Sequence, residues 1–399
     1  MPDAGSSSAR LIATSLGGGR KRLCLGIAAA PFVLWDELIE LIRIGLAPLG
    51  FEVCRIGPAE VASRDWDGFL WLGNGDGLQA MADAVAAMGP QRPPTLLWQL
   101  DPLPPPDLPP ELEEIGLRIA RRDNHHFPAW CRLIVRRCVP FRRYWVRLIQ
   151  YRDLRRMAGE GRSGREFAKP GAETVARVSR YWDFIRREVE RGTLDQVAVS
   201  VPPRCEFLRR RGIPATVLPL GFHPSMGNDA GGRDGEPDGA RDFDVVFLGA
   251  VGRTRRVQLL RQLGGELARS GIHLLVVGKS CYGARRARLL SRAKIVLNVN
   301  TVPWDMPGFR FLTAIGCGAM VVSEPIRDPS PFHPGRHYVE TPVAQLPDAI
   351  RHYVRDDDGR SAIVAAARRF LQEEHTWEQS MLRLGNWFHV HSAVSTRGM

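Results

Sequence analysis

Residues 295–325 form the segment that most constrains the fold. The apolar run Ile295–Asn300 predicts a strand buried in a parallel sheet, and Ala319–Val322 predicts a second one. Between them lie a loop rich in Pro and Gly and a short helix over about Phe309–Gly316, which ends at a small-residue turn. The segment is therefore predicted to be strand, loop, helix and strand, the repeating unit of α/β folds.

The loop before that helix is the first candidate ligand site. In open α/β sheets, ligands bind where the carboxyl end of a strand meets the amino end of the next helix. Here this is the stretch 300–310, which offers backbone N–H groups, the Asp305 carboxylate and the Arg310 guanidinium. We therefore expect a ligand to bind beside Asp305 and Arg310.

Strands and helices alternate through the rest of the chain as well. Further strands are predicted at 22–29, 51–56, 68–72, 95–100, 196–200, 215–220, 243–248 and 274–278. Such alternation is typical of βαβ units with parallel sheets. The 399 residues are enough for two or three domains.

A second candidate site follows the strand at 243–248. The turn Gly249–Arg256 contains Gly and leads into a helix, a geometry that presents N–H groups to phosphate. Arg is not preferred at a helix N-terminus, because the macrodipole is positive there. The arginines at 253, 255 and 256 therefore indicate an anionic ligand, with arginines that simply face solvent as the alternative.

Three stretches resemble one family. The run PGFRFLTAIGCGAMVVSE at 307–324 resembles the donor-site helix of GT-B glycosyltransferases, most closely the CgeB-like branch. VLPLGFHPSMG at 217–227 resembles the hinge between the domains of these enzymes, and WQLDPLPPP at 98–106 resembles a strand end that carries an Asp. Related enzymes have two acidic residues eight positions apart; here Asp305 stands at the first position and Thr313 at the second.

The resemblance implies a GT-B architecture: an α/β fold with two Rossmann-like domains that face each other across a cleft. Together with the chain's pattern it predicts a disordered leader at 1–20 and an N-terminal acceptor domain at 21–222, with a helical insertion at about 111–190. A linker at 223–241 is expected to lead to a C-terminal donor domain at 242–376. A final helix at 377–399 is expected to pack back on the first domain.

The resemblance also implies a function, the transfer of a sugar from a nucleoside diphosphate sugar, a co-substrate, to an unidentified carbohydrate or lipid-linked acceptor, with no other cofactor. The implied catalytic residues are Asp305, Arg310 and Asp101. The residues expected to bind the donor are Gly249, Arg253, Arg255, Lys279, Gly308, Phe309 and Thr313. Enzymes of this type commonly carry two bases in the turn after the strand at 243–248; Gly249-Ala250 lacks the first, and Arg255 falls where the second would lie.

No metal is expected. GT-B folds stabilise the departing diphosphate with Arg or Lys and helix N-termini, and this chain has no Asp-x-Asp element to hold a cation. Its seven Cys are scattered without a zinc-binding spacing.

The net charge of +12 indicates an anionic partner, although the Arg usage of a GC-rich genome would explain it equally well. Arginines alternate with aromatic residues over about 121–156, a pattern that fits an amphipathic helix, contact with an anionic membrane surface, or nucleic-acid binding as the least favoured of the three. No apolar run reaches the roughly 18 residues of a membrane span. We expect a cytoplasmic protein, with peripheral contact with the inner membrane face as a further possibility. A non-catalytic protein that binds a nucleotide sugar or another anion is the alternative function.

Overall fold

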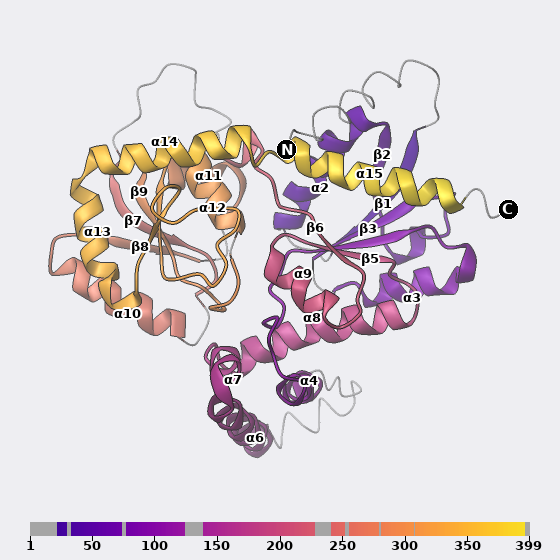
Figure 1. Cartoon of the computed structure of the whole chain (residues 1–399), viewed down its shortest axis with the longest axis horizontal. Helices are drawn as coiled ribbons and strands as arrows, with labels where there is room; N and C mark the ends of the chain where they lie inside the picture. The colour runs from indigo at the N-terminus through magenta and orange to yellow at the C-terminus, as the bar shows by residue number, and fades with distance from the viewer. Residues whose placement is uncertain are drawn as a thin grey trace, which may run out of the picture.

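The computed structural model describes residues 22–29, 33–73, 77–123, 139–227, 241–251, 255–278, 281–306 and 308–395. Two separate parallel sheets, each covered by helices, make up the two halves of the molecule (Figure 1). This is the GT-B architecture that the sequence predicted, and it is confirmed.

The first domain is built on a sheet with the strand order β2-β1-β3-β4-β5-β6. Its strands are β1 (Leu23–Ala29), β2 (Phe51–Arg55), β3 (Gly68–Leu72), β4 (Thr95–Gln99), β5 (Gln196–Val199) and β6 (Ala215–Val217). Every residue of β3 and β4 is buried, because helices cover both faces of the sheet.

The second domain is built on a sheet with the order β11-β10-β9-β7-β8. Its strands are β7 (Phe243–Leu248), β8 (Leu274–Val277), β9 (Ala293–Asn298), β10 (Met320–Ser323) and β11 (Val339–Glu340). In both sheets the first strand pairs with the second on one side and with the third on the other. This order creates a switch point beside the first strand of each domain, and such points bind ligands in doubly wound folds.

Helices pack around both sheets. In the first domain they are α2 (Val33–Leu46), α3 (Gln79–Ala87) and α9 (Pro202–Arg209). In the second domain they are α10 (Arg255–Ala268), α11 (Gly283–Ser291), α12 (Gly308–Gly316), α13 (Leu346–Arg355) and α14 (Asp357–Glu373). Within the described residues, no helix combines the length and the apolar character needed to cross a membrane.

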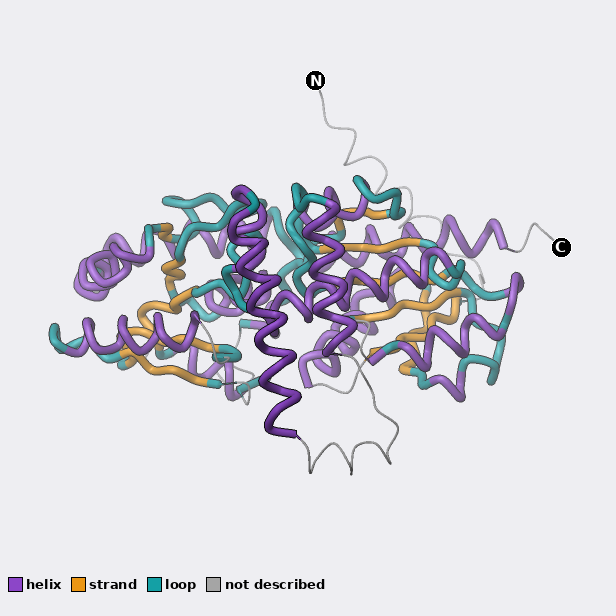
Figure 2. The backbone as a smooth tube through the Cα atoms, turned by 90° about the horizontal axis from the view of Figure 1, so that it is seen from below, coloured by secondary structure: helices purple, strands orange, loops and turns teal. Residues whose placement is uncertain are grey.

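Between β4 and β5 the chain forms a group of helices below the first sheet. They are α4 (Pro110–Asp123), α6 (Val139–Gly159), α7 (Gly161–Ala168) and α8 (Ala172–Glu190). In Figure 1, α8 runs under the first domain toward the second, and in the view from below the strands fall into two groups with helices across the space between them (Figure 2). The group is therefore placed beside both domains.

The chain crosses between the domains twice, and the two crossings lie side by side. Phe222 N–H donates to the carbonyl of His375 and Trp377 N–H donates to the carbonyl of Phe222, both at 2.8 Å. A Cβ on Gly221 would lie 2.0 Å from the carbonyl oxygen of Thr376, so only glycine allows this approach. From here α15 (Trp377–Ser395) returns across the first domain, and its Trp377 indole donates to the Leu41 carbonyl at 3.0 Å.

Two strands end two or more residues earlier than their apolar sequences predicted. β9 ends at Asn298 rather than Asn300, because the Asn300 N–H turns to the Glu324 carboxylate at 2.6 Å. β6 ends at Val217 rather than Leu220, since Pro219 has no N–H to continue the ladder.

Candidate functional site

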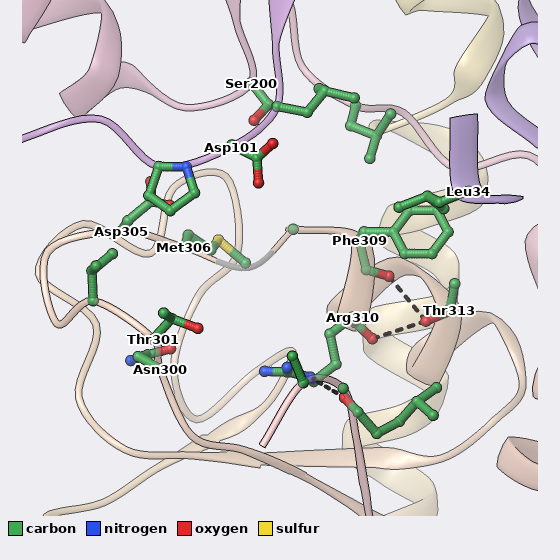
Figure 3. Close-up of a pocket in the computed structure, with 18 of the residues that line it drawn as sticks. Leu34, Asp101, Ser200, Asn300, Thr301, Asp305, Met306, Phe309, Arg310 and Thr313 are labelled. Carbon is green, nitrogen blue, oxygen red and sulfur yellow. Dashed lines mark hydrogen bonds between the residues drawn. The ribbon is translucent and has the colours of Figure 1, made fainter. Parts of the chain in front are cut away.

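A cleft of about 560 Å³ lies between the two domains, within the usual size of ligand pockets, about 300–1,000 Å³. From the first domain it is lined by the chain after β4 and β5, which places Asp101 and Ser200 on one wall. The opposite wall carries Gly249 after β7 and the stretch from Asn300 to Arg310 after β9. Figure 3 shows the two walls facing each other, with Asp101 and Ser200 across from Arg310.

The wall of the second domain coincides with its switch point. β7 and β9 are neighbours in the sheet, and the segments that leave their carboxyl ends run to opposite faces toward α10 and α12. This divergence opens a crevice at the strand ends. The sequence-predicted loop at 300–310 and the predicted turn after β7 therefore meet at one place.

Arg310, on the first turn of α12, lies in this crevice. Its guanidinium donates to the carbonyl oxygen of Leu248 at 3.1 Å and to the side-chain oxygen of Asn298, both neutral acceptors. It also lies over the ring of Phe247, 5.1 Å from the centroid. Burial, together with the charge of Arg256, lowers the pKa of Arg310 to about 9. Arg310 thus brings a poorly solvated positive charge to the cleft wall.

Arg256 supports the same region from behind. It is buried, and it donates to the carbonyls of Ala250 and Val299 at 2.7 and 2.6 Å, which ties the turn after β7 to the end of β9. Its Nε is buried without a hydrogen-bond partner among the described residues. Burial lowers the pKa of Arg256 to about 10 even though the nearby Glu324 carboxylate raises it. The sequence singled out Arg256 only as one of three arginines in this turn that indicate an anionic ligand.

Gly249 allows the close approach of Arg310 to β7. Its φ is +141°, and a Cβ would lie 2.9 Å from Nη2 of Arg310. Its N–H donates to the Val277 carbonyl at 3.0 Å. The predicted donor-site glycine therefore leaves space for the guanidinium in this structure.

Asp305 also lines the cleft, but its carboxylate is already bound. Both of its oxygens accept from Arg204 of α9, at 2.8 and 2.7 Å, and both side chains are buried. Arg204 additionally donates to the Leu100 carbonyl and to the Ser200 hydroxyl at 2.7 and 3.0 Å. The pair therefore joins the domains directly beneath the cleft. Nothing in the sequence pointed to this pair, because Arg204 lies in a short helix and other arginines lie nearby.

The remaining predicted residues surround the same cleft. Asp101 and Phe309 are half-buried in its walls, and Gly308 is the first residue of α12. The Thr313 hydroxyl donates to the Phe309 carbonyl at 2.9 Å within the helix, as Figure 3 shows. Arg286, which the sequence did not single out, lies over the Phe309 ring at 4.9 Å and pairs with Glu37 of the first domain at 3.0 Å.

Arg255 has a different environment from the one expected. Its guanidinium pairs with both oxygens of Glu324, so a carboxylate of the protein already neutralises it. Two predicted donor-binding residues, Arg253 and Lys279, lie outside the described residues. No group of three or more His, Cys, Asp or Glu side chains that could hold a metal ion occurs in the part of the chain that the structure describes.

Residues 253–385 match a protein family described as glycosyl transferase-like, which confirms the resemblance over most of the second domain. No curated protein matches the sequence. Among solved structures, HepE of Anabaena, in complex with UDP and glucose, is 13% identical, with 92% of this chain and 99% of that chain covered and a TM-score of 0.52. A glycosyltransferase of Rickettsia africae is 8% identical, with 92% and 98% covered, at a TM-score of 0.46. The likeness to HepE is one of fold.

The Arg204–Asp305 pair generates a stability prediction. Arg204→Ala leaves a buried carboxylate without its partner, a change that typically costs about 3–5 kcal/mol. We expect a loss of that order in the free energy of unfolding, measured by urea denaturation. Arg43→Ala is the matched control, because Arg43 and its partner Glu40 are both more than half exposed, at 56% and 54%. Equal, small losses of unfolding free energy in the two variants would show that the Arg204–Asp305 pair does not stabilise the protein.

Proposed function

Since residues 253–385 match a glycosyl transferase-like family and the chain has a GT-B fold, we propose that the protein transfers a sugar from a nucleoside diphosphate sugar to a hydroxyl acceptor in the cleft. An acceptor oxygen forms a bond to the anomeric carbon while the bond from that carbon to the diphosphate oxygen breaks. The hydroxyl proton passes to a base. The products are a glycoside, a nucleoside diphosphate and a proton.

One observation carries this proposal: a poorly solvated cation stands at the switch point of the second domain. Among the described residues, Arg310 donates there to neutral acceptors only, beside the amino end of α12. A diphosphate is the natural complement of a guanidinium and a helix N-terminus. UDP is the nucleotide we propose to test first, because HepE, which shares the fold, binds UDP and glucose.

We propose roles for the predicted residues within this cleft. Arg310 stabilises the charge that develops on the leaving diphosphate, and Gly249 and Gly308 let backbone groups approach it. Asp305 binds sugar hydroxyls, since a carboxylate oxygen that accepts from Arg204 still has a free lone pair. Asp101 faces the donor wall as the candidate acceptor ligand or base.

The other predicted donor contacts stay predictions. Thr313 would offer its hydroxyl oxygen to a ribose while its proton stays on the helix carbonyl. Arg255 would remain paired with Glu324 and attract the diphosphate through its positive charge. Phe309 would form an apolar part of the cleft wall. Peripheral contact with an anionic membrane also stays a prediction; Tyr151 and Arg152 on α6 are exposed, with 54% of Tyr151 and 78% of the Arg152 side chain accessible.

The proposal is tested by incubating the protein with a panel of UDP-sugars and following the release of free UDP. A transferase releases UDP and raises its melting temperature with UDP, because a ligand specific for the native state stabilises it. A non-catalytic binder would show the thermal shift without release. Absence of both, with GDP-sugars as well, would refute the proposal.

The mechanism predicts a large effect at Arg310. Arg310→Ala should lower kcat at least about a hundredfold, because removal of one donor to a developing oxyanion typically costs that much. The measurement is the steady-state rate of UDP release, with circular dichroism to verify the fold. Arg292→Ala is the control, since this exposed arginine pairs with Asp242 away from the cleft. Near-normal turnover in Arg310→Ala would remove Arg310 from the mechanism.

We also propose that transfer needs no metal, because arginine and helix N–H groups supply the positive charge that a cation would otherwise provide. The rate of UDP release is then expected to be the same in excess EDTA and in added Mg²⁺ or Mn²⁺. Loss of activity in EDTA that returns on addition of one of these metals would count against the proposal.

A further inference from the structure

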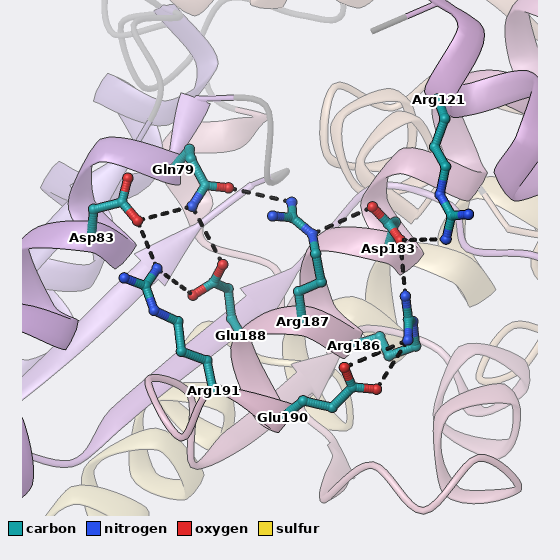
Figure 4. A network of polar contacts seen from close by, with 9 residues as sticks. All are labelled: Gln79, Asp83, Arg121, Asp183, Arg186, Arg187, Glu188, Glu190 and Arg191. Carbon is teal, nitrogen blue, oxygen red and sulfur yellow. Dashed lines mark hydrogen bonds and ion pairs between the residues drawn. The ribbon is translucent and has the colours of Figure 1, made fainter.

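The helix α8 carries arginines whose environments differ from one end to the other. In its C-terminal half, Arg186 and Arg187 both pair with Asp183 at 3.3 Å, and Arg186 also pairs with Glu190 at 3.1 Å. Arg191, just after the helix, pairs with Asp83 at 2.6 Å and lies near the buried Glu188. Figure 4 shows this network, in which each arginine meets a carboxylate.

Arg177, in the N-terminal half of the same helix, is different. Its half-buried side chain lines the cleft between the domains, and its Nε is buried without a hydrogen-bond partner in the part of the chain that the structure describes. Nε of Arg186 also lacks a partner, but the terminal nitrogens of Arg186 pair with Asp183 and Glu190, whereas no ion pair among the described residues includes Arg177. A partly desolvated arginine without an acceptor is costly, so its place at the cleft calls for a ligand.

Arg177 lines the cleft from the first-domain side, and its charge acts on a cation of the second domain. The positive charge of Arg177 lowers the pKa of Arg256, beyond the larger lowering by burial, so the two guanidiniums are close enough to repel each other. The positive charge of Arg256 in turn lowers the pKa of Arg310, in addition to the larger lowering by burial. Arg177 and Arg310 both line the cleft, as does Ala250, and the buried Arg256 lies behind the second-domain wall. An anion in the cleft would reduce the repulsion between Arg177 and Arg256 and between Arg256 and Arg310.

We propose that Arg177 binds the diphosphate of the donor from the first-domain side, opposite Arg310. This inference rests on the proposed function and adds to it a contact from α8, within the helical insertion predicted at about 111–190. Arg177 would hold the phosphate oxygens while the bond from the anomeric carbon to the diphosphate breaks, and would keep the charge of the released nucleoside diphosphate compensated.

The test compares the binding of UDP, by isothermal titration calorimetry, with the binding of uridine, by NMR titration. Arg177→Ala should weaken UDP binding about tenfold or more, because one charge-assisted contact to phosphate is lost, and should leave uridine binding unchanged. Arg177→Lys should restore part of the UDP affinity. Arg187→Ala, on the same helix but in the surface network, should bind UDP as the wild type does.

Two results would overturn the inference, and they are distinguishable. If the wild type binds UDP and Arg177→Ala binds it equally well, Arg177 does not contact the diphosphate, while the proposed function stands. If the wild type binds neither UDP nor GDP, the inference fails together with the proposed function. Arg177→Gln, which keeps much of the apolar stem, replaces Arg177→Ala should that variant unfold, and its expected loss of affinity is the same.

Discussion

The cleft depends on positive charge that the second domain holds partly out of water. Arg310 and Arg256 donate only to neutral oxygens in the described part of the chain, and both lie over the ring of Phe247. Neutral acceptors and an aromatic face offset the desolvation of a cation only in part. A bound anion would compensate the remainder. The same arrangement therefore favours a ligand that carries negative charge, such as the proposed diphosphate.

Both walls of this charged region are held in place by contacts across the domains. Arg204 binds Asp305 under the cleft, and Glu37 pairs with Arg286 while it accepts from the Gly283 N–H at 2.6 Å at the start of α11. One apolar cluster also continues from the first domain into the second, with Trp98 stacked on Trp377 at 6.0 Å. The loops of the site therefore rest on elements with fixed relative positions, as precise positioning of a reacting group requires.

The sequence predicted what depends on local pattern. Alternating strands and helices, and the loop at 300–310 before α12, were readable because buried parallel strands are apolar and ligand loops follow their carboxyl ends. The partners of the charged groups were not readable. Asp305 meets Arg204 over a separation of 101 residues, and nothing local distinguishes Arg204 from its neighbours. Arg177 was likewise hidden, since an arginine on an amphipathic helix resembles any solvated one.

The paired crossings at Phe222 and Trp377 limit how the domains can move relative to each other. A single connecting strand permits both bending and twisting about its own axis, whereas two strands joined by hydrogen bonds resist twisting. Gly221 brings the two backbones into contact, so one cannot slide freely past the other. Any relative motion of the domains is therefore expected to be a bending about this seam, which keeps Asp101 opposite the wall that carries Arg310.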